Sequence, residues 1–208
     1  MRVLSNGLEV FRVDDQRIVY RDSKGKDIFV FDSKYAVLDV GGVGNEGDIR
    51  VRDNNGKSRI HLDGQTGDIK LLGADCAEDF NISDPEDIEP GTVMVIDQNG
   101  RLSENNKAYD KKVAGVISGA GECKPGIILG KGDSDATRMP VALSGTVYCK
   151  VDARYAPIEA GDLLVTSSTP GHAMKAEDPF KAFGAVIGKA LQPLGSGQGL
   201  IPILVSLQ

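Results

Sequence analysis

The stretch RDNNGKSRIHLD, residues 52–63, repeats an earlier stretch, RDSKGKDIFVFD, residues 21–32, without a gap and with five identical positions in twelve. In each copy a Lys-Gly or Asn-Gly pair precedes a short run, FVF or IHL, whose alternate side chains share one face of a strand. Glycine reaches the positive φ angles that a tight hairpin turn needs. The repeat therefore predicts β-hairpins made of a strand, a turn and a second strand.

Fainter copies of the same unit surround these two. SNGLEVFRVD (5–14) matches SKGKDIFVFD (23–32), and GNEGDIRV (44–51) matches GQTGDIKL (64–71). Each unit has few large apolar side chains, so it buries little surface alone and is expected to stack or to intertwine with other chains. The sequence predicts that an oligomer core is formed by alternating apolar positions of these strands: Ile28, Val30, Ile60, Leu62, Ile69 and Leu71.

The histidine and the aspartates of the second copy have a repeat explanation as well as a chemical one. His61 occupies the position of Val30 in the first copy, and Asp63 occupies that of Asp32. Aspartate at a turn accepts backbone N–H bonds, so these residues are interpreted first as repeat positions and only second as ligands.

A different duplication occupies the C-terminal part. IEPGTVMV (88–95) aligns with IEAGDLLV (158–165) at an offset of seventy, and VAGVISG (113–119) falls on FGAVIGK (183–189) at the same offset. Each half is a set of short apolar strands separated by Gly and Pro turns. The fold class is therefore mainly β, with N-terminal hairpin repeats forming a shaft, followed by an internally duplicated small β-barrel or β-clip-like domain.

Three parts of the chain are expected. Residues 1–73 form the repeat shaft, 74–90 form an acidic linker or collar, and 91–208 form the duplicated β domain. The middle part is interpreted as a solvated linker because it is rich in carboxylates and prolines, and like charges repel. A short stretch from Ser103 to Lys112 is the only helix candidate.

Composition excludes several classes of partner. A formal net charge of −6 disfavours nucleic acid, and the sequence shows neither a Sec signal nor an apolar run that would insert in a membrane. Synthesis in the cytoplasm is expected. Three widely spaced cysteines fit reduced thiols better than a disulfide framework, and the residue pattern predicts no cofactor and no metal.

Two local clusters suggest alternative functions. Ser167, Ser168, His172 and Lys175 lie close together, and a serine needs a nearby base to become a nucleophile, so a hydrolytic or self-cleaving domain is one alternative. A carbohydrate-binding module is another, because sugars stack on aromatic rings. Its candidate loops carry Tyr109, Tyr148 and Tyr155.

Several motifs together resemble a known group. They include GDIRVRDNNGKSRIHLDGQTGDI (47–69), VAGVI (113–117), VALSG (141–145) and GDLLVTS (161–167). The chain is similar over residues 44–208 to an uncharacterised bacterial group of β-repeat proteins. The C-terminal half also resembles the terminal domains of phage tail-fibre and appendage proteins. This resemblance implies a trimeric, fibrous or surface-displayed part.

The sequence thus favours a structural and adhesive component of a fibre-like or surface appendage. Its main expected partner is itself, as a homo-oligomer and most simply a trimer. A surface glycan or another appendage protein is a further expected partner of the C-terminal domain, within an extracellular or virion-like assembly.

Overall fold

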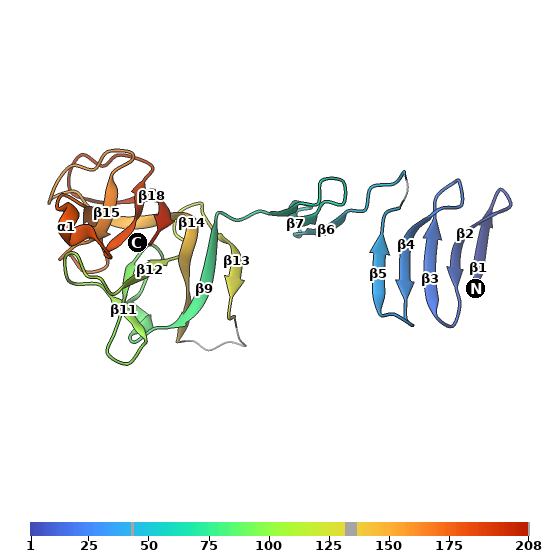
Figure 1. Ribbon diagram of the computed structural model, residues 1–208, viewed down its shortest axis with the longest axis horizontal. Coiled ribbons are helices and arrows are strands. Elements are labelled where there is room, and N and C mark those ends of the chain that lie inside the picture. Colours follow the sequence, from blue (N-terminus) through green and yellow to red (C-terminus); the bar gives the residue numbers. More distant parts are fainter. Residues whose placement is uncertain (43, 132–136, 208) are drawn as a thin grey trace. The chain divides into compact units, whose positions relative to one another are not determined.

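The computed structural model describes residues 1–42, 44–131 and 137–207, and it is nearly all β (Figure 1). The chain divides into two compact units, Met1–Leu72 and Gly73–Gln208, here called the N-terminal unit and the head. The expected fold class is confirmed.

The N-terminal unit consists of two antiparallel sheets whose strands follow chain order. The five-stranded sheet contains β1 (Arg2–Ser5), β2 (Leu8–Val13), β3 (Arg17–Arg21), β4 (Asp27–Asp32) and β5 (Val37–Val40). The three-stranded sheet contains β6 (Ile49–Arg52), β7 (Ser58–Leu62) and β8 (Ile69–Leu71).

The repeated turns adopt the same structure in both copies. Asp22 Oδ1 accepts the N–H groups of Lys24 and Lys26 at 2.8 and 2.9 Å, and Gly25 has φ 78°. Asp53 Oδ1 likewise accepts N–H groups two and four residues on, at 2.9 and 3.0 Å, and its turn glycine has φ 79°. The hairpin prediction is confirmed at these turns because a carboxylate and a glycine together fix the loop.

The head holds the remaining elements. They are β9 (Asp75–Asn81), η1 (Pro85–Asp87), β10 (Val93–Ile96), β11 (Leu102–Glu104), β12 (Val113–Ile117), β13 (Pro125–Leu129), β14 (Arg138–Asp152), β15 (Leu163–Thr166), β16 (Ala173–Lys175), α1 (Pro179–Ala182), β17 (Val186–Ala190) and β18 (Gln198–Ser206). Strands β14, β16, β15, β17 and β18 pair in that order, and β18 returns to β14, so this sheet closes into a five-stranded barrel. Its interior is apolar and includes Val147, Cys149, Leu164, Ile187 and Ile203.

The internal duplication is visible as two matching sets of strands. β10 pairs with β11 and β12, as β15 pairs with β16 and β17, and both central strands carry a bulge at the same place, Met94/Val95 and Leu164/Val165. The third strands correspond at an offset of 73 rather than 70, because Gly115 lies opposite Met94 and Gly188 opposite Leu164. The sequence alignment of 113–119 with 183–189 was therefore three residues out of register.

Two local expectations differ from the structure. Residues 75–81, expected in a solvated linker, form β9, which pairs with β13 and β14 and buries Ala77 completely. Alternate side chains of β9 face inward, so Asp75, Ala77 and Asp79 are buried, and strand pairing rather than charge decides the local structure. The helix expected over 103–112 is absent from this described stretch, which begins with β11 and continues as a loop.

Candidate functional site

The three-stranded sheet of the N-terminal unit has one entirely apolar face. Cross-strand register places Ile49, Leu62 and Ile69 in one row. Val51, Ile60 and Leu71 form the next row. Five of these side chains are exposed, from 37% for Leu62 to 71% for Ile69, and Leu71 is half-buried. These two rows are called the six-residue face below.

The reverse side of the same sheet is charged. Arg50, His61 and Lys70 form its central row, because they alternate with the apolar positions. His61 Nε2 lies 3.0 Å from Asp48 Oδ2. The ammonium group of Lys70 hydrogen-bonds to Asp63 and is the main cause that lowers the pKa of that carboxyl below its usual range. Exposure to water is therefore favourable for this charged side and unfavourable for the six-residue face.

The five-stranded sheet shows the same asymmetry. One side carries the row Phe11, Tyr20, Phe29 and Val40, whose neighbouring rings have centroids 4.6 and 6.1 Å apart. The next row on that side is Val13, Ile18, Phe31 and Leu38. Tyr20, Phe31 and Leu38 are 49%, 43% and 50% exposed. An aromatic and aliphatic surface thus stands open to solvent.

Ion pairs cover the opposite side of this sheet. Val19 lies in register with Arg12 and Val30 and is completely buried. Arg21 bonds to Glu9 nearby, and Arg17 Nε lies 2.5 Å from Asp32 Oδ2. The side chain of Val30 therefore shares the charged side.

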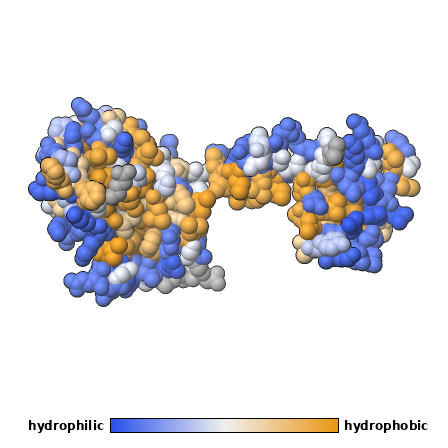
Figure 2. Space-filling view, viewed as in Figure 1, coloured by the Kyte–Doolittle hydropathy of each residue, from blue (hydrophilic) through white to orange (hydrophobic). Residues whose placement is uncertain are grey.

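The apolar sides of the two sheets meet at an open groove of about 480 Å³. Leu38 from β5 lines it together with Ile49, Leu62 and Ile69 of the six-residue face, and three carboxylates, Asp39, Asp63 and Asp68, also lie at its wall. Figure 2 shows hydrophobic side chains gathered along this side of the N-terminal unit. The unit thus presents one extended apolar surface rather than scattered apolar residues, and such surfaces mark interaction sites.

The structure places the expected core residues in two groups. Ile60, Leu62, Ile69 and Leu71 all belong to the six-residue face. Val30 lies on the charged side of its sheet, and Ile28 is the unpaired residue of a bulge beside Asp27. Sequence reasoning missed Phe29 and Phe31, because every position from 28 to 31 is apolar and alternation alone cannot assign the side.

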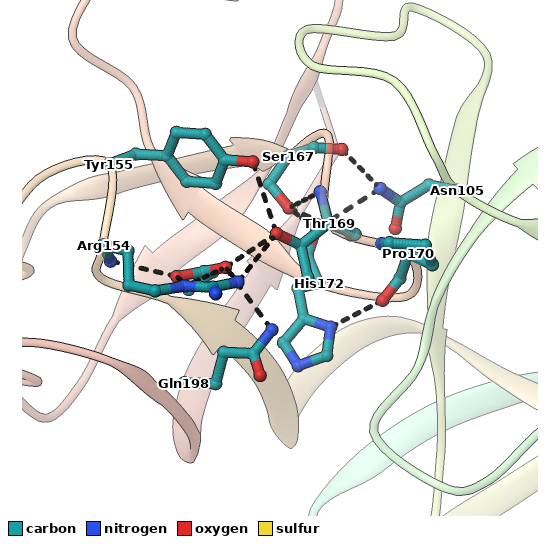
Figure 3. A network of polar contacts seen from close by, with 9 residues as sticks. Asn105, Arg154, Tyr155, Ser167, Thr169, Pro170, His172 and Gln198 are labelled. Carbon is teal, nitrogen blue, oxygen red and sulfur yellow. Dashed lines mark hydrogen bonds and ion pairs between the residues drawn. The ribbon is translucent and has the colours of Figure 1, made fainter.

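Ser167 and His172 flank the turn between β15 and β16 (Figure 3), Ser168 lies within that turn, and Lys175 ends β16. Ser167 is buried, and its hydroxyl donates to the carbonyl oxygens of Thr169 and His172 at 3.1 and 2.9 Å. The His172 ring instead donates from Nδ1 to Pro170 O at 2.6 Å, and Lys175 pairs with Asp162 at 2.9 Å. Ser168 is exposed, and within the described chain no base hydrogen-bonds to its hydroxyl or to that of Ser167. The geometry therefore supplies no activated nucleophile here.

Asp152 hydrogen-bonds to Arg154, Thr169 and Gln198, which Figure 3 labels. Its carboxylate is completely buried and accepts bonds from Arg154 Nε at 2.9 Å, Thr169 Oγ1 at 2.6 Å and Gln198 Nε2 at 3.4 Å. The hydrogen bond from Arg154 is the largest of the causes that lower the pKa of Asp152 below its usual range. This carboxylate hydrogen-bonds to three segments at one end of the barrel and thereby holds them together.

The three candidate ligand tyrosines lie in separate surroundings. The Tyr109 hydroxyl accepts the N–H groups of Glu177 and Asp178, each at 3.1 Å. Tyr155 is 47% exposed and contacts Thr169, whereas the Tyr148 ring lies against Gly121. No described contact brings the three rings together as one sugar-binding platform.

No group of three His, Cys, Asp or Glu side chains converges in the described chain as metal ligands would. The same residues contain no helix with the length and apolar character needed to span a bilayer.

Comparison with known proteins adds little to the geometry. No protein-family model and no curated protein matches the sequence. Among solved structures, the pre-mature form of gene product 12 of bacteriophage phi29 matches with a TM-score of 0.46 and 17% identity. The match covers 72% of this chain but only 25% of that one. The likeness is too distant to support a conclusion about function.

Proposed function

We propose that this protein is a structural component of a fibre-like appendage, which assembles through the apolar surface of its N-terminal unit and presents the head for binding. The observation that carries the proposal is the six-residue face, on which every side chain is apolar and none is fully buried in the single chain. A role in a virion-like or surface assembly belongs to the same proposal.

The physical argument is that a sheet with a bare apolar face gains stability only by covering it. A sheet that is hydrophobic on one face must bury that face against another element to form a stable domain. Burying exposed apolar surface contributes about 25 cal/mol per Å². Further copies of the same chain supply a matching apolar face, with the charged sides left in water.

Three copies fit this arrangement as follows. Each sheet is apolar on one side only, so three sheets around a common axis direct three apolar sides inward and three charged sides outward. The interior then contains residues of the six-residue face from every copy, and the ion pairs of Arg50, Lys70 and Asp63 stay outside. In the proposal the assembly is therefore a homotrimer, and a two-layer dimer is the main competing arrangement.

The proposal is tested by the molar mass of the full chain in solution. Sedimentation equilibrium should give three times the chain mass at micromolar concentration. Ile60→Asp should shift the protein to monomer over that range, because it removes apolar burial of about 2 kcal/mol per chain and places an unpaired carboxylate in the interior.

Leu129→Asp is the matched control. Leu129 is 50% exposed on β13 of the head, compared with 41% for Ile60 on β7, and lies outside the proposed interface. This variant should retain the wild-type mass. A wild-type chain that stays monomeric at every accessible concentration would refute the proposal, and a mass of two chains would refute the trimer.

The head is proposed to bind a surface glycan or another appendage protein, and glycan-array screening of the assembled full chain tests the first. Binding that survives replacement of Tyr155, the exposed ring of the three candidates, by Ala would argue against a stacking role for that ring.

A further inference from the structure

The head displays two phenylalanine rings almost entirely in solvent. Phe180 is 93% exposed and Phe183 is 82% exposed, both at the short helix α1. Large aromatic side chains bury 150–250 Å² when they pack, so leaving two of them bare is costly unless a partner covers them. These two rings are called the aromatic knob below.

The backbone beneath the aromatic knob is firmly held. Asp178 Oδ1 accepts the N–H groups of Phe180 and Lys181 at 3.0 and 3.2 Å, which caps α1. Ala182 is buried below, and the Tyr109 hydroxyl bonds the two backbone N–H groups that lead into the helix. Rings on so fixed a support lose little freedom on binding, as is typical of interface anchors.

A complementary hollow lies on the outside of the barrel. It has a volume of about 390 Å³ and is lined by Leu163, Val186 and Leu204, with Lys189 and Ser206 also at its wall. The register aligns Leu163, Lys189 and Leu204 across β15, β17 and β18. Leu163 and Leu204 are 41% and 43% exposed, so this head pocket is an accessible apolar recess with a cationic edge.

We propose that the aromatic knob of one copy docks into the head pocket of the neighbouring copy. Charge supports this pairing as well as shape. Glu177 precedes α1 and Lys189 borders the pocket, and neither side chain forms an ion pair with any described residue. Docking brings the two together across the interface.

This contact rests on the homo-oligomer proposed above. Knob and pocket are different surfaces, so the contact is heterologous, and within the proposed trimer it closes into a ring. Two rings bury roughly 300–500 Å², which is below the roughly 1,000 Å² of a stable interface. The knob therefore docks when the N-terminal units hold the heads at high effective concentration, and it fixes the heads of an assembly already formed.

Cysteine pairing in mixed oligomers of the full chain tests the inference. Phe183→Cys chains labelled with ¹⁵N and unlabelled Leu204→Cys chains are unfolded, refolded together and oxidised. Mass spectrometry should find a disulfide-linked peptide pair with one heavy and one light partner, at least tenfold above the same experiment with Leu129→Cys in place of Leu204→Cys. Leu129 is the matched control because it is at least as exposed, at 50% compared with 43% for Leu204, and lies on β13 away from the pocket.

The outcomes separate this inference from the proposed function. If the chains assemble but the disulfide between residues 183 and 204 does not form, the docking proposal is overturned and the proposed assembly is not. If the mixture is monomeric, both the docking and the assembly are overturned. A Phe180→Ser, Phe183→Ser double variant should keep the wild-type oligomer mass. When this double substitution is present in chains that carry Lys189→Cys or Glu177→Cys, the disulfide link between the heads should no longer form. Binding of the full chain to phosphatidylcholine vesicles through these rings is the competing outcome. If the full chain binds such vesicles, the double variant does not, and no link forms, then the rings contact a lipid surface and the docking is overturned.

Discussion

Single carboxylates have two different structural roles in this protein. At the hairpin turns, the half-buried Asp22 and Asp53 accept backbone N–H groups and set the loop geometry. Asp152 is instead buried and joins Arg154, Thr169 and Gln198. The difference predicts where a charge matters for stability, because a buried carboxylate that loses its charge leaves several donors without a full partner.

We expect Asp152→Asn to lower the free energy of unfolding of the head by about 2 kcal/mol at pH 7. The bonds from Arg154 hold the folded-state pKa of Asp152 below the unfolded value of about 3.9. Its stabilisation is therefore complete above that unfolded value and is lost as the pH falls through the folded pKa. Urea unfolding at pH 7 and pH 3, followed by hydrogen exchange of β14 and β18, measures both effects.

The variant should show a smaller loss of head stability between pH 7 and pH 3 than the wild type. Asp87→Asn is the control, since Asp87 is exposed in η1 and its carboxylate accepts no hydrogen bond from a described residue. Equal acid sensitivity in the wild type and in Asp152→Asn would remove Asp152 as a source of the pH dependence.

At the scale of elements, the duplicated head depends on two equivalent glycines. Gly115 lies on β12 and Gly188 on β17, where each strand passes close to a carbonyl of the next strand. A Cβ atom would lie 2.6 Å from Ala142 O at the first position and 2.1 Å from Leu204 O at the second. The duplication thus preserves the close backbone contact as well as the strand order.

Gly188→Ala should destabilise the head by at least about 2 kcal/mol, because the added methyl group forces strands β17 and β18 apart. Thermal unfolding measures the effect, and Gly115→Ala should behave similarly. Gly195→Ala is the control, since nothing lies within 4 Å of a Cβ atom built there. An unchanged melting temperature in Gly188→Ala would contradict the close contact between β17 and β18.

For the whole molecule, the two units are stabilised in different ways. The head contains nearly all of the buried apolar side chains in the described chain, whereas the N-terminal unit contributes only Val19 to that set. A unit with so small an interior gains its stability from hairpin hydrogen bonds, ion pairs and, under the proposal, from other copies. Folding of the N-terminal unit and assembly are then linked by mass action.

Calorimetry of the full chain over a hundredfold range of concentration should show two transitions. The transition of the N-terminal unit should move to higher temperature as concentration rises, and that of the head should stay fixed. Assignment comes from hydrogen exchange of β7 and β18 during heating. Two transitions that are both independent of concentration would contradict assembly-linked folding.

The sequence alone determined the local and repeated features of this protein. The Asp and Gly positions of residues 21–32 and 52–63 fixed the hairpin turns, because their chemistry acts within a few residues, and the duplications predicted the mainly β fold and the paired halves of the head. The tertiary structure decided which side of each strand faces where. Register put Phe29 and Phe31 on the apolar side and Val30 on the charged side, and it drew residues 75–81 into a sheet despite their charge. A one-residue change in strand pairing exchanges the two sides, and pairing depends on partner strands distant in sequence, so this information is not contained in a local pattern.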